Sequence, residues 1–177
     1  YKMPGIKIIS PMTPKEYLVA YNDFMNNEDV MYVSEHRGSY SNTKELNDYL
    51  DDNLDLILFP ISITRFEAQK AKVELEKEGY KIGIANILWI KPFLIKQEWE
   101  QAIIKSKFGG IVLDDDYTDG VASSLAYQLI KKTKKNFEVM GLKDRSAGFS
   151  KLTDNLPPSH KEIIVKCKEI INKKVKS

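Results

Sequence analysis

Short apolar runs alternate along the chain with longer segments in which apolar residues recur at helical spacing. The β-branched run Ile6–Ile9 predicts a strand, residues 13–25 predict an amphipathic helix, and Val30–Val33 predicts a second strand. The polar stretch 38–53 is rich in Ser, Asn and Asp, which is typical of a linker. The apolar face expected for the first helix consists of Tyr17, Leu18, Tyr21, Phe24 and Met25.

After the linker the alternation becomes regular. The expected strands are 54–61, 80–88, 109–113 and 137–141, and the expected helices are 64–79, 98–107, 120–132 and 159–171. Strands that alternate with helices of about 10–15 residues indicate crossover connections and a mostly parallel sheet. The sequence therefore predicts an α/β fold: a three-layer sandwich around a mostly parallel, mixed sheet of the five-stranded type, preceded by a β-α-β remnant of a neighbouring α/β domain.

Three stretches have the Ser/Thr-x-x-Glu pattern of a capping box, in which the two side chains satisfy backbone N–H groups at a helix start. They are Thr13–Glu16, Thr64–Glu67 and Ser159–Glu162. Each stands directly before a helical apolar pattern, and Pro14 adds the proline favoured at the first helical position. We expect a helix to begin at each of the three.

Composition narrows the function classes. Apolar residues make up 42% and charged residues 29%, as in soluble globular proteins, and the net charge of +2 gives no concentrated basic face for nucleic acid. No apolar run approaches the ~20 residues that span a bilayer, so no membrane partner is expected. The single cysteine excludes an internal disulfide and fits a reducing, cytoplasmic location. Lysines gather in the last helix, where they are expected to form a solvated face: Lys161, Lys166, Lys168, Lys173, Lys174 and Lys176.

Few residues suggest chemistry on their own. Asp114–Asp116, at the end of a predicted strand, could bind Mg²⁺ through carboxylate oxygens, but we favour a simple interaction with the N-terminus of the next helix. Cys167 lies among isoleucines and is expected to be a small buried apolar residue. His160, in the first turn of the last helix, is expected to be exposed.

Glu35, His36 and Arg37 arrive together at the end of the Val30–Val33 strand. Arg37 could bind an anionic substrate group through its guanidinium fork and His36 through a ring proton. A solvated rim of the sheet is the alternative. Composition and spacing leave both interpretations open.

Residues 3–40, MPGIKIISPMTPKEYLVAYNDFMNNEDVMYVSEHRGSY, resemble the end of the pyrimidine-binding domain of thiamine-diphosphate enzymes of the transketolase superfamily. The resemblance is nearest to the beta subunit of 2-oxoacid dehydrogenases such as pyruvate dehydrogenase, in which a strand led by Pro-Gly precedes a Thr/Ser-Pro helix start and a strand ending in Glu-His-Lys. The matching positions are Pro4, Gly5, Lys7, Pro11, Thr13, Pro14, Glu35 and His36.

The remaining chain is similar to the C-terminal domain of the same superfamily. Ile90–Pro92 resembles an apolar-Lys-Pro strand end, Gly110–Gly120 a strand followed by acids and glycine, and Gly141–Asp144 a Gly-x-x-Asp turn. The resemblance implies three parts: residues 1–37 as the tail of the pyrimidine domain, 38–53 as a linker, and 54–177 as a transketolase-type C-terminal domain. A start at Tyr1 then suggests part of a longer protein.

The resemblance implies an enzyme that uses thiamine diphosphate and Mg²⁺, held between a pyrophosphate domain and a pyrimidine domain of different chains. This sequence lacks the Gly-Asp-Gly…Asn motif that binds Mg²⁺ and diphosphate, and the glutamate that activates the cofactor is expected upstream of Tyr1. We therefore expect this chain to bind no cofactor and to be inactive alone. It would serve dimerisation and shape the substrate entrance in a homodimer or an alpha/beta heterotetramer.

Substrate-binding roles for His36 and Arg37 follow from the same resemblance. Glu35–His36 resembles the dehydrogenase beta subunit, whereas Arg37–Gly38 resembles 1-deoxyxylulose-5-phosphate synthases, whose arginines contact substrate phosphate. A ketol-transferring transketolase or synthase is therefore the second hypothesis. Some beta subunits bind potassium at the turn matching Phe24–Asp29, but the pattern is altered here. A receiver-like interaction module with Asp115 as phosphoacceptor is a rival of another class, although these acids follow a later strand than that fold requires.

Overall fold

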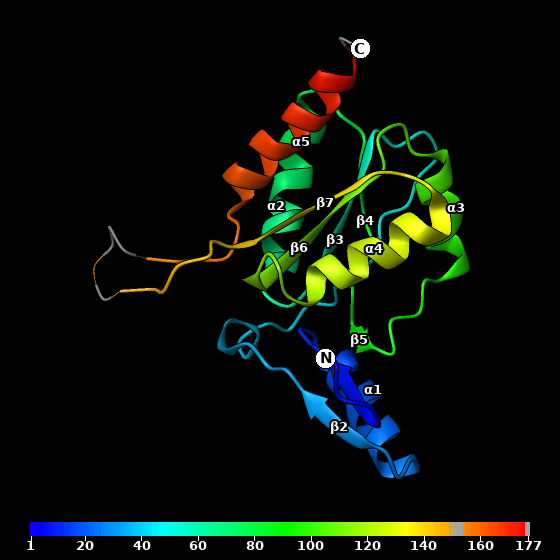
Figure 1. Cartoon of the computed structure of the whole chain (residues 1–177), viewed down its shortest axis with the longest axis vertical. Coiled ribbons are helices and arrows are strands. Elements are labelled where there is room, and N and C mark those ends of the chain that lie inside the picture. The colour runs from blue at the N-terminus through cyan, green and yellow to red at the C-terminus, as the bar shows by residue number, and fades with distance from the viewer. Residues whose placement is uncertain (149, 151–153, 176–177) are drawn as a thin grey trace.

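The computed structural model describes residues 1–148, 150 and 154–175, and within them the strands form two sheets (Figure 1). One sheet has the order β2-β1-β5 and the other has the order β4-β3-β6-β7. The strands are β1 (Ile6–Ile9), β2 (Val30–Val33), β3 (Leu56–Pro60), β4 (Ile82–Ile84), β5 (Trp89–Lys91), β6 (Gly110–Tyr117) and β7 (Phe137–Leu142). The helices are α1 (Pro14–Asn26), the short 3-10 helix η1 (Arg37–Ser39), α2 (Thr64–Lys77), α3 (Gln97–Lys105), α4 (Val121–Thr133) and α5 (His160–Val175).

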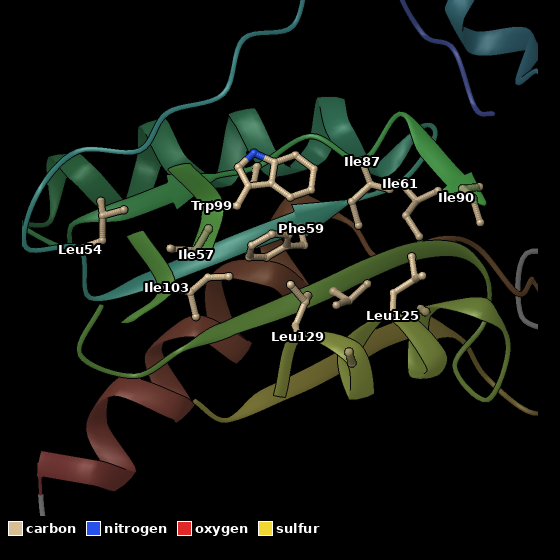
Figure 2. Close-up of a cluster of buried hydrophobic side chains, with 14 residues drawn as sticks. Leu54, Ile57, Phe59, Ile61, Ile87, Ile90, Trp99, Ile103, Leu125 and Leu129 are labelled. Atoms are coloured by element: carbon tan, nitrogen blue, oxygen red, sulfur yellow. The ribbon is translucent and has the colours of Figure 1, made fainter. Parts of the chain in front are cut away.

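The larger sheet is parallel and lies between two helical layers, with α2 and α5 on one face and α3 and α4 on the other (Figure 1). Alternate residues of β3 point to opposite faces. Leu56 and Leu58 join the α2–α5 core, and Ile57 and Phe59 join the core under α3 and α4. In that second core the Phe59 ring meets the Trp99 ring edge to face at a centroid distance of 5.6 Å (Figure 2). The predicted α/β fold class is confirmed.

The strand expected over 80–88 is shorter in the structure. Only Ile82–Ile84 forms β4, and an isolated parallel bridge between Ile61 and Ile87 continues its pairing with the segment after β3. The next strand, Trp89–Lys91, was not predicted as a separate strand, and it pairs antiparallel with β1 of the small sheet. The described part of the large sheet therefore has four strands, and an isolated antiparallel bridge between Tyr49 and Ile84 extends it at the β4 edge. The bridge comes from the predicted linker, which is held against the sheet at this residue.

The N-terminal unit consists of β1, α1 and β2, with β1 and β2 parallel and Ile6 opposite Val30. Lys7 on one face of this small sheet reaches Asp23 of α1 at 2.9 Å, so α1 covers that face. The predicted apolar face of α1 is present, but it does not form a core. Ala20 is buried, whereas Tyr21 and Met25 are 64% and 76% exposed.

Two of the three capping boxes are found, one of them altered. Thr13 accepts the N–H of Glu16, but the Glu16 carboxylate accepts the Met12 N–H at 2.9 Å and extends further to an arginine. The Ser159–Glu162 box is complete in both directions. At Thr64–Glu67 the predicted helix start is confirmed, since α2 begins at Thr64, but the capping box is not formed. The N-cap residue is Ile63, which has no polar side chain, and the Thr64 hydroxyl donates backwards to the Ile61 carbonyl at 2.6 Å.

Among the described residues, no helix is long and apolar enough to cross a membrane.

Candidate functional site

A cleft of about 370 Å³ separates the N-terminal unit from the carboxyl edge of the large sheet. Its floor on one side is the uncovered face of the small sheet, and its opposite wall is the end of β6 and the start of α4. In open α/β sheets, ligands bind at the carboxyl ends of parallel strands, which makes this edge the leading candidate site. The lining residues are Tyr1, Met3, Ile6, Ile8, Tyr32, Ser34, Ile90, Asp116 and Val121.

Glu35, His36 and Arg37 follow β2, in the segment where the chain leaves the small sheet and reaches the large one. Gly38 contacts the Ile63 side chain so closely that an added Cβ would approach its Cδ1 to 2.7 Å. The His36 ring caps η1, with its Nδ1 accepting the Gly38 N–H at 3.0 Å. A neutral His36 therefore carries its proton on Nε2, which makes this atom a donor. The Arg37 guanidinium is exposed and makes no ion pair within the described part of the chain.

Asp114–Asp116 form a bulge in β6. The pair Leu113–Met140 is followed by Tyr117–Leu142, so β6 advances four residues while β7 advances two. Asp115 accepts the hydroxyl of Ser62 at 2.6 Å, and Ser62 holds an uncommon positive φ of 53° at the end of β3. This bond ties the edges of β3 and β6 together beside the cleft.

Asp114 is the unusual carboxyl of this edge. It is 2% exposed, and its Oδ2 has no hydrogen-bond partner among the described residues. Burial, followed by the charge of Asp115, raises the pKa of Asp114 to about 7. At neutral pH this carboxyl is thus divided between its protonated and charged forms.

The magnesium interpretation of these acids is not supported by their geometry. Asp115 is engaged by Ser62 while Asp114 is buried beside it, and no group of three carboxylates, histidines or cysteines that could hold a metal occurs in the described residues. The carboxylates of Asp115 and Asp116 are thus engaged by Ser62 and by the Tyr117 N–H, and they do not form an open metal site with Asp114. In the turn that was considered for potassium, Phe24–Asp29, the polar side chains are also engaged within the chain. The Asn27 amide donates to the Asp23 carbonyl, and the Asp29 carboxylate lies 3.4 Å from the Lys7 amine.

Two other candidate residues lie away from the cleft. His160 is not exposed as expected: its backbone N–H and its Nδ1 both lie within 2.9 Å of the Glu67 carboxylate, which joins α5 to α2. Cys167 is fully buried, as predicted, and burial raises the pKa of its thiol to about 12. Of the C-terminal lysines, Lys166 and Lys168 pair with Glu138 and Glu78, and the side chains of Lys174 and Lys176 lie outside the described residues.

A buried polar junction that sequence reasoning missed holds the two units together. Arg65 of α2 is fully buried, and it forks onto Glu16 of α1 while its Nε donates to Asn86 at 3.1 Å. Asn86 in turn donates its backbone N–H to Asp48 of the linker at 2.7 Å. An available signal was Arg65 itself, a cation in the first turn of a helix, where the helix dipole disfavours positive charge.

No protein-family model matches the sequence, and no curated protein matches it significantly. Among solved structures, the fold is similar to one described as "Split gene transketolase, inactive beta4 tetramer", with a TM-score of 0.72 and 12% sequence identity. The match covers 97% of this chain and 59% of that one, so this chain spans less than two thirds of its neighbour's length.

This likeness confirms the transketolase resemblance at the level of the fold. It includes the small sheet as well as the large one, because 97% of the chain is matched. The nearer resemblance to dehydrogenase beta subunits, the three-part division and the roles of His36 and Arg37 remain predictions.

Proposed function

We propose that this chain is the C-terminal portion of a thiamine-diphosphate-dependent enzyme of the 2-oxoacid dehydrogenase beta-subunit type. In this proposal residues 1–37 are the last part of a pyrimidine-binding domain, 38–53 are the linker, and 54–177 are a domain that serves dimerisation. The chain shapes the substrate entrance and does not hold the cofactor by itself.

The observation that carries the proposal is the unfinished small sheet. Ile6, Ile8 and Tyr32 lie on the face opposite α1, since their register alternates with Lys7. Ile8 contacts the core under α3 and α4, whereas Ile6 is half-buried and Tyr32 is 61% exposed. The outer edge of β2 has no strand partner among the described residues. A two-layer fragment with an open apolar face and a free edge is the expected appearance of an α/β domain whose other strands and helices lie elsewhere. The exposed apolar residues of α1 have the same explanation.

The residues after β2 would act on the substrate through charge and hydrogen bonding. Arg37 would bind a carboxylate or phosphate through two parallel N–H donors, and His36 would donate its Nε2 proton to a neighbouring oxygen. Thiamine diphosphate, held by other parts of the complete enzyme, would supply the electron sink for cleavage next to a carbonyl. His36 and Arg37 are not among the residues that line the cleft, but they follow Ser34, which does. The Arg65–Glu16 junction would hold the small sheet, and with it this segment, next to the cleft.

Reconstitution tests this proposal. The 177-residue chain alone is expected to bind no thiamine diphosphate in calorimetry, whereas the complete polypeptide, or this chain with a partner that carries Gly-Asp-Gly…Asn, should bind it in a Mg²⁺-dependent manner. The complete enzyme should then decarboxylate 2-oxoacids, measured with an artificial electron acceptor. Absence of cofactor binding by the complete assembly would contradict the proposal.

Ketol transfer is the second candidate, and two observations favour it. The structural neighbour is described as a transketolase, and Arg37 is exposed beside Gly38 as an available phosphate-binding cation. Sugar-phosphate turnover without 2-oxoacid decarboxylation in the same assembly would establish this candidate over the first.

A further inference from the structure

β7 is an open edge of the large sheet. Asn136 accepts the Gly110 N–H, and Val112 is the register partner of Val139, so the even-numbered residues of β7 direct their backbone groups toward β6. Phe137, Val139 and Gly141 therefore direct their N–H and C=O groups outward. No backbone partner for these groups occurs within the described ranges.

Monomeric proteins usually protect such edges with proline, short strands, bulges or covering segments. The opposite edge of this sheet follows that rule, because the Tyr49 bridge covers β4. β7 is six residues long, contains no proline, and its register is regular from Phe137 to Met140. Its one charged residue is Glu138, which is paired with Lys166 at 2.5 Å.

A groove of about 410 Å³ runs beside this edge, between β7 and α5. Its apolar residues are Met140 and Val165, and Val165 is 56% exposed. Its charged residues are two lysines and two glutamates: Lys161, Lys166, Glu162 and Glu169. A two-fold interface places the same patch on both chains against itself. A groove that carries both signs of charge allows its lysines to face the partner's glutamates, so this patch has no net charge that would oppose such an arrangement.

We propose that β7 and the adjacent groove bind a second copy of this chain through antiparallel β7–β7 pairing across a two-fold axis. The outward groups of Val139 would face those of the partner's Val139, and Phe137 would face the partner's Gly141. Both α5 helices would then lie on the same side of an eight-stranded sheet, where the two grooves meet. This inference rests on the dimerisation role proposed above for residues 54–177, and it adds the surface that performs the role.

A proline at the centre of the pairing tests the geometry. Val139→Pro removes an N–H that points away from β6, so the ladder within one chain is retained while pairing between chains is blocked. The 177-residue chain should have twice its mass of 20.3 kDa in light scattering, and V139P should raise the dissociation constant about 100-fold or more. Val139→Thr, which keeps the N–H and the β-branched shape, should remain dimeric. A monomeric wild type, or a dimeric V139P, would overturn the proposal.

A helix variant makes the test independent of any effect of proline on folding. Val165→Asp places a charge in the apolar part of the groove at an exposed position, and it should also weaken the dimer. The matched control is Ile104→Asp on α3, where the side chain is 50% exposed on the other helical layer and should leave the mass unchanged. If Val165→Asp and Ile104→Asp weaken the dimer equally, or if neither weakens it, the chains associate through another surface, such as the open face of the small sheet. Cofactor binding by the complete enzyme is measured separately, so failure here leaves the proposed function standing.

Discussion

Arg65 at the start of α2 directs both terminal nitrogens to the carboxylate of Glu16 in α1, at distances of 2.7 and 2.5 Å. Arg65 is fully buried and Glu16 is 14% exposed at its side chain, so solvent screens this pair little. The pair lies between the two units of the chain and, with Asn86, links α1 to the turn after β4. It fixes how the small sheet faces the large one.

Glu16→Ala should destabilise the protein by about 3–5 kcal/mol, because it leaves a buried guanidinium without its counter-charge. Urea unfolding measures the loss. The control is Asp52→Ala, which breaks the exposed Lys105–Asp52 pair and should cost under about 1 kcal/mol. The double variant E16M/R65M should recover most of the stability, and failure to do so would mean that the pair has no net coupling.

Asp114 makes stability fall as pH rises. Its pKa is raised from 3.8 to about 7 in the folded protein, so the folded state holds a proton that the unfolded state has released between these values. Asp114→Asn should remove this slope, and at pH 8 it should be more stable than wild type by about 4 kcal/mol at most. Chemical unfolding at pH 4 to 8 measures the difference. Asp51→Asn in the linker, where the side chain is exposed, should leave the slope unchanged. Parallel profiles for D114N and wild type would contradict the assignment.

Glu67 has the opposite pH dependence. Burial favours its neutral form, but hydrogen bonds from Lys70 and from the His160 backbone and ring outweigh burial and hold the pKa of Glu67 at about 2. Its stabilising effect is complete above about pH 4.5 and is lost as pH falls toward 2.

Glu67→Gln should therefore destabilise the α2–α5 contact at pH 7, by about 3 kcal/mol at most, and have little effect near pH 2. Thermal unfolding across this range measures the effect. Glu74→Gln is a suitable control, since its nearest approach to His160 is 3.8 Å and its side chain is 50% exposed.

Cys167 should be chemically inert in the folded protein. Its thiol is fully buried with a pKa of about 12, so almost no thiolate is present at pH 8. A thiol reagent should label it only after denaturant is added, at a rate that follows global unfolding. Rapid labelling of the native protein would show that α5 opens locally from the sheet.

If Arg37 binds the substrate as proposed, Arg37→Ala lowers kcat/KM of the complete enzyme by about 10-fold to 100-fold, mainly through KM, because the two proposed charge-assisted hydrogen bonds would be lost. Arg37→Lys should restore only part of the lost kcat/KM, since the lysine ammonium lacks the two parallel N–H donors of a guanidinium. Lys15→Ala, an exposed cation at the start of α1, is the control. Unchanged kinetics in R37A would return Glu35–Arg37 to the interpretation as a solvated rim.

Local patterns predicted much of the fold. The bounds of β1 and β2 match the expected runs, and Ser159 and Glu162 cap α5 as their spacing indicates. The isoleucine stripe around Cys167 correctly predicted the buried face of α5. These features depend on residues within a few positions of one another, which periodicity and capping rules describe.

The sequence predictions that were wrong concern polar groups whose hydrogen-bond partners come from distant segments of the chain. The Glu67 carboxylate binds His160, 93 residues away, and the Glu16 carboxylate binds Arg65. The strand expected over 80–88 loses its regular pairing after Ile84, although Ile87 still bridges Ile61. The Asn86 N–H bonds to Asp48 of the predicted linker, and Trp89–Lys91 then pairs with β1. Rules based on spacing do not contain these partners.

The sequence by itself determined which segments become helices and strands and which faces are apolar, because the balance of propensity and periodicity is decided within each segment. The tertiary structure decided which apolar faces form a core, why the pKa of Asp114 is raised, and how the two units meet. These depend on burial and on partners as far apart in sequence as Glu16 and Arg65, separated by 49 positions, and only folding brings such groups out of water together.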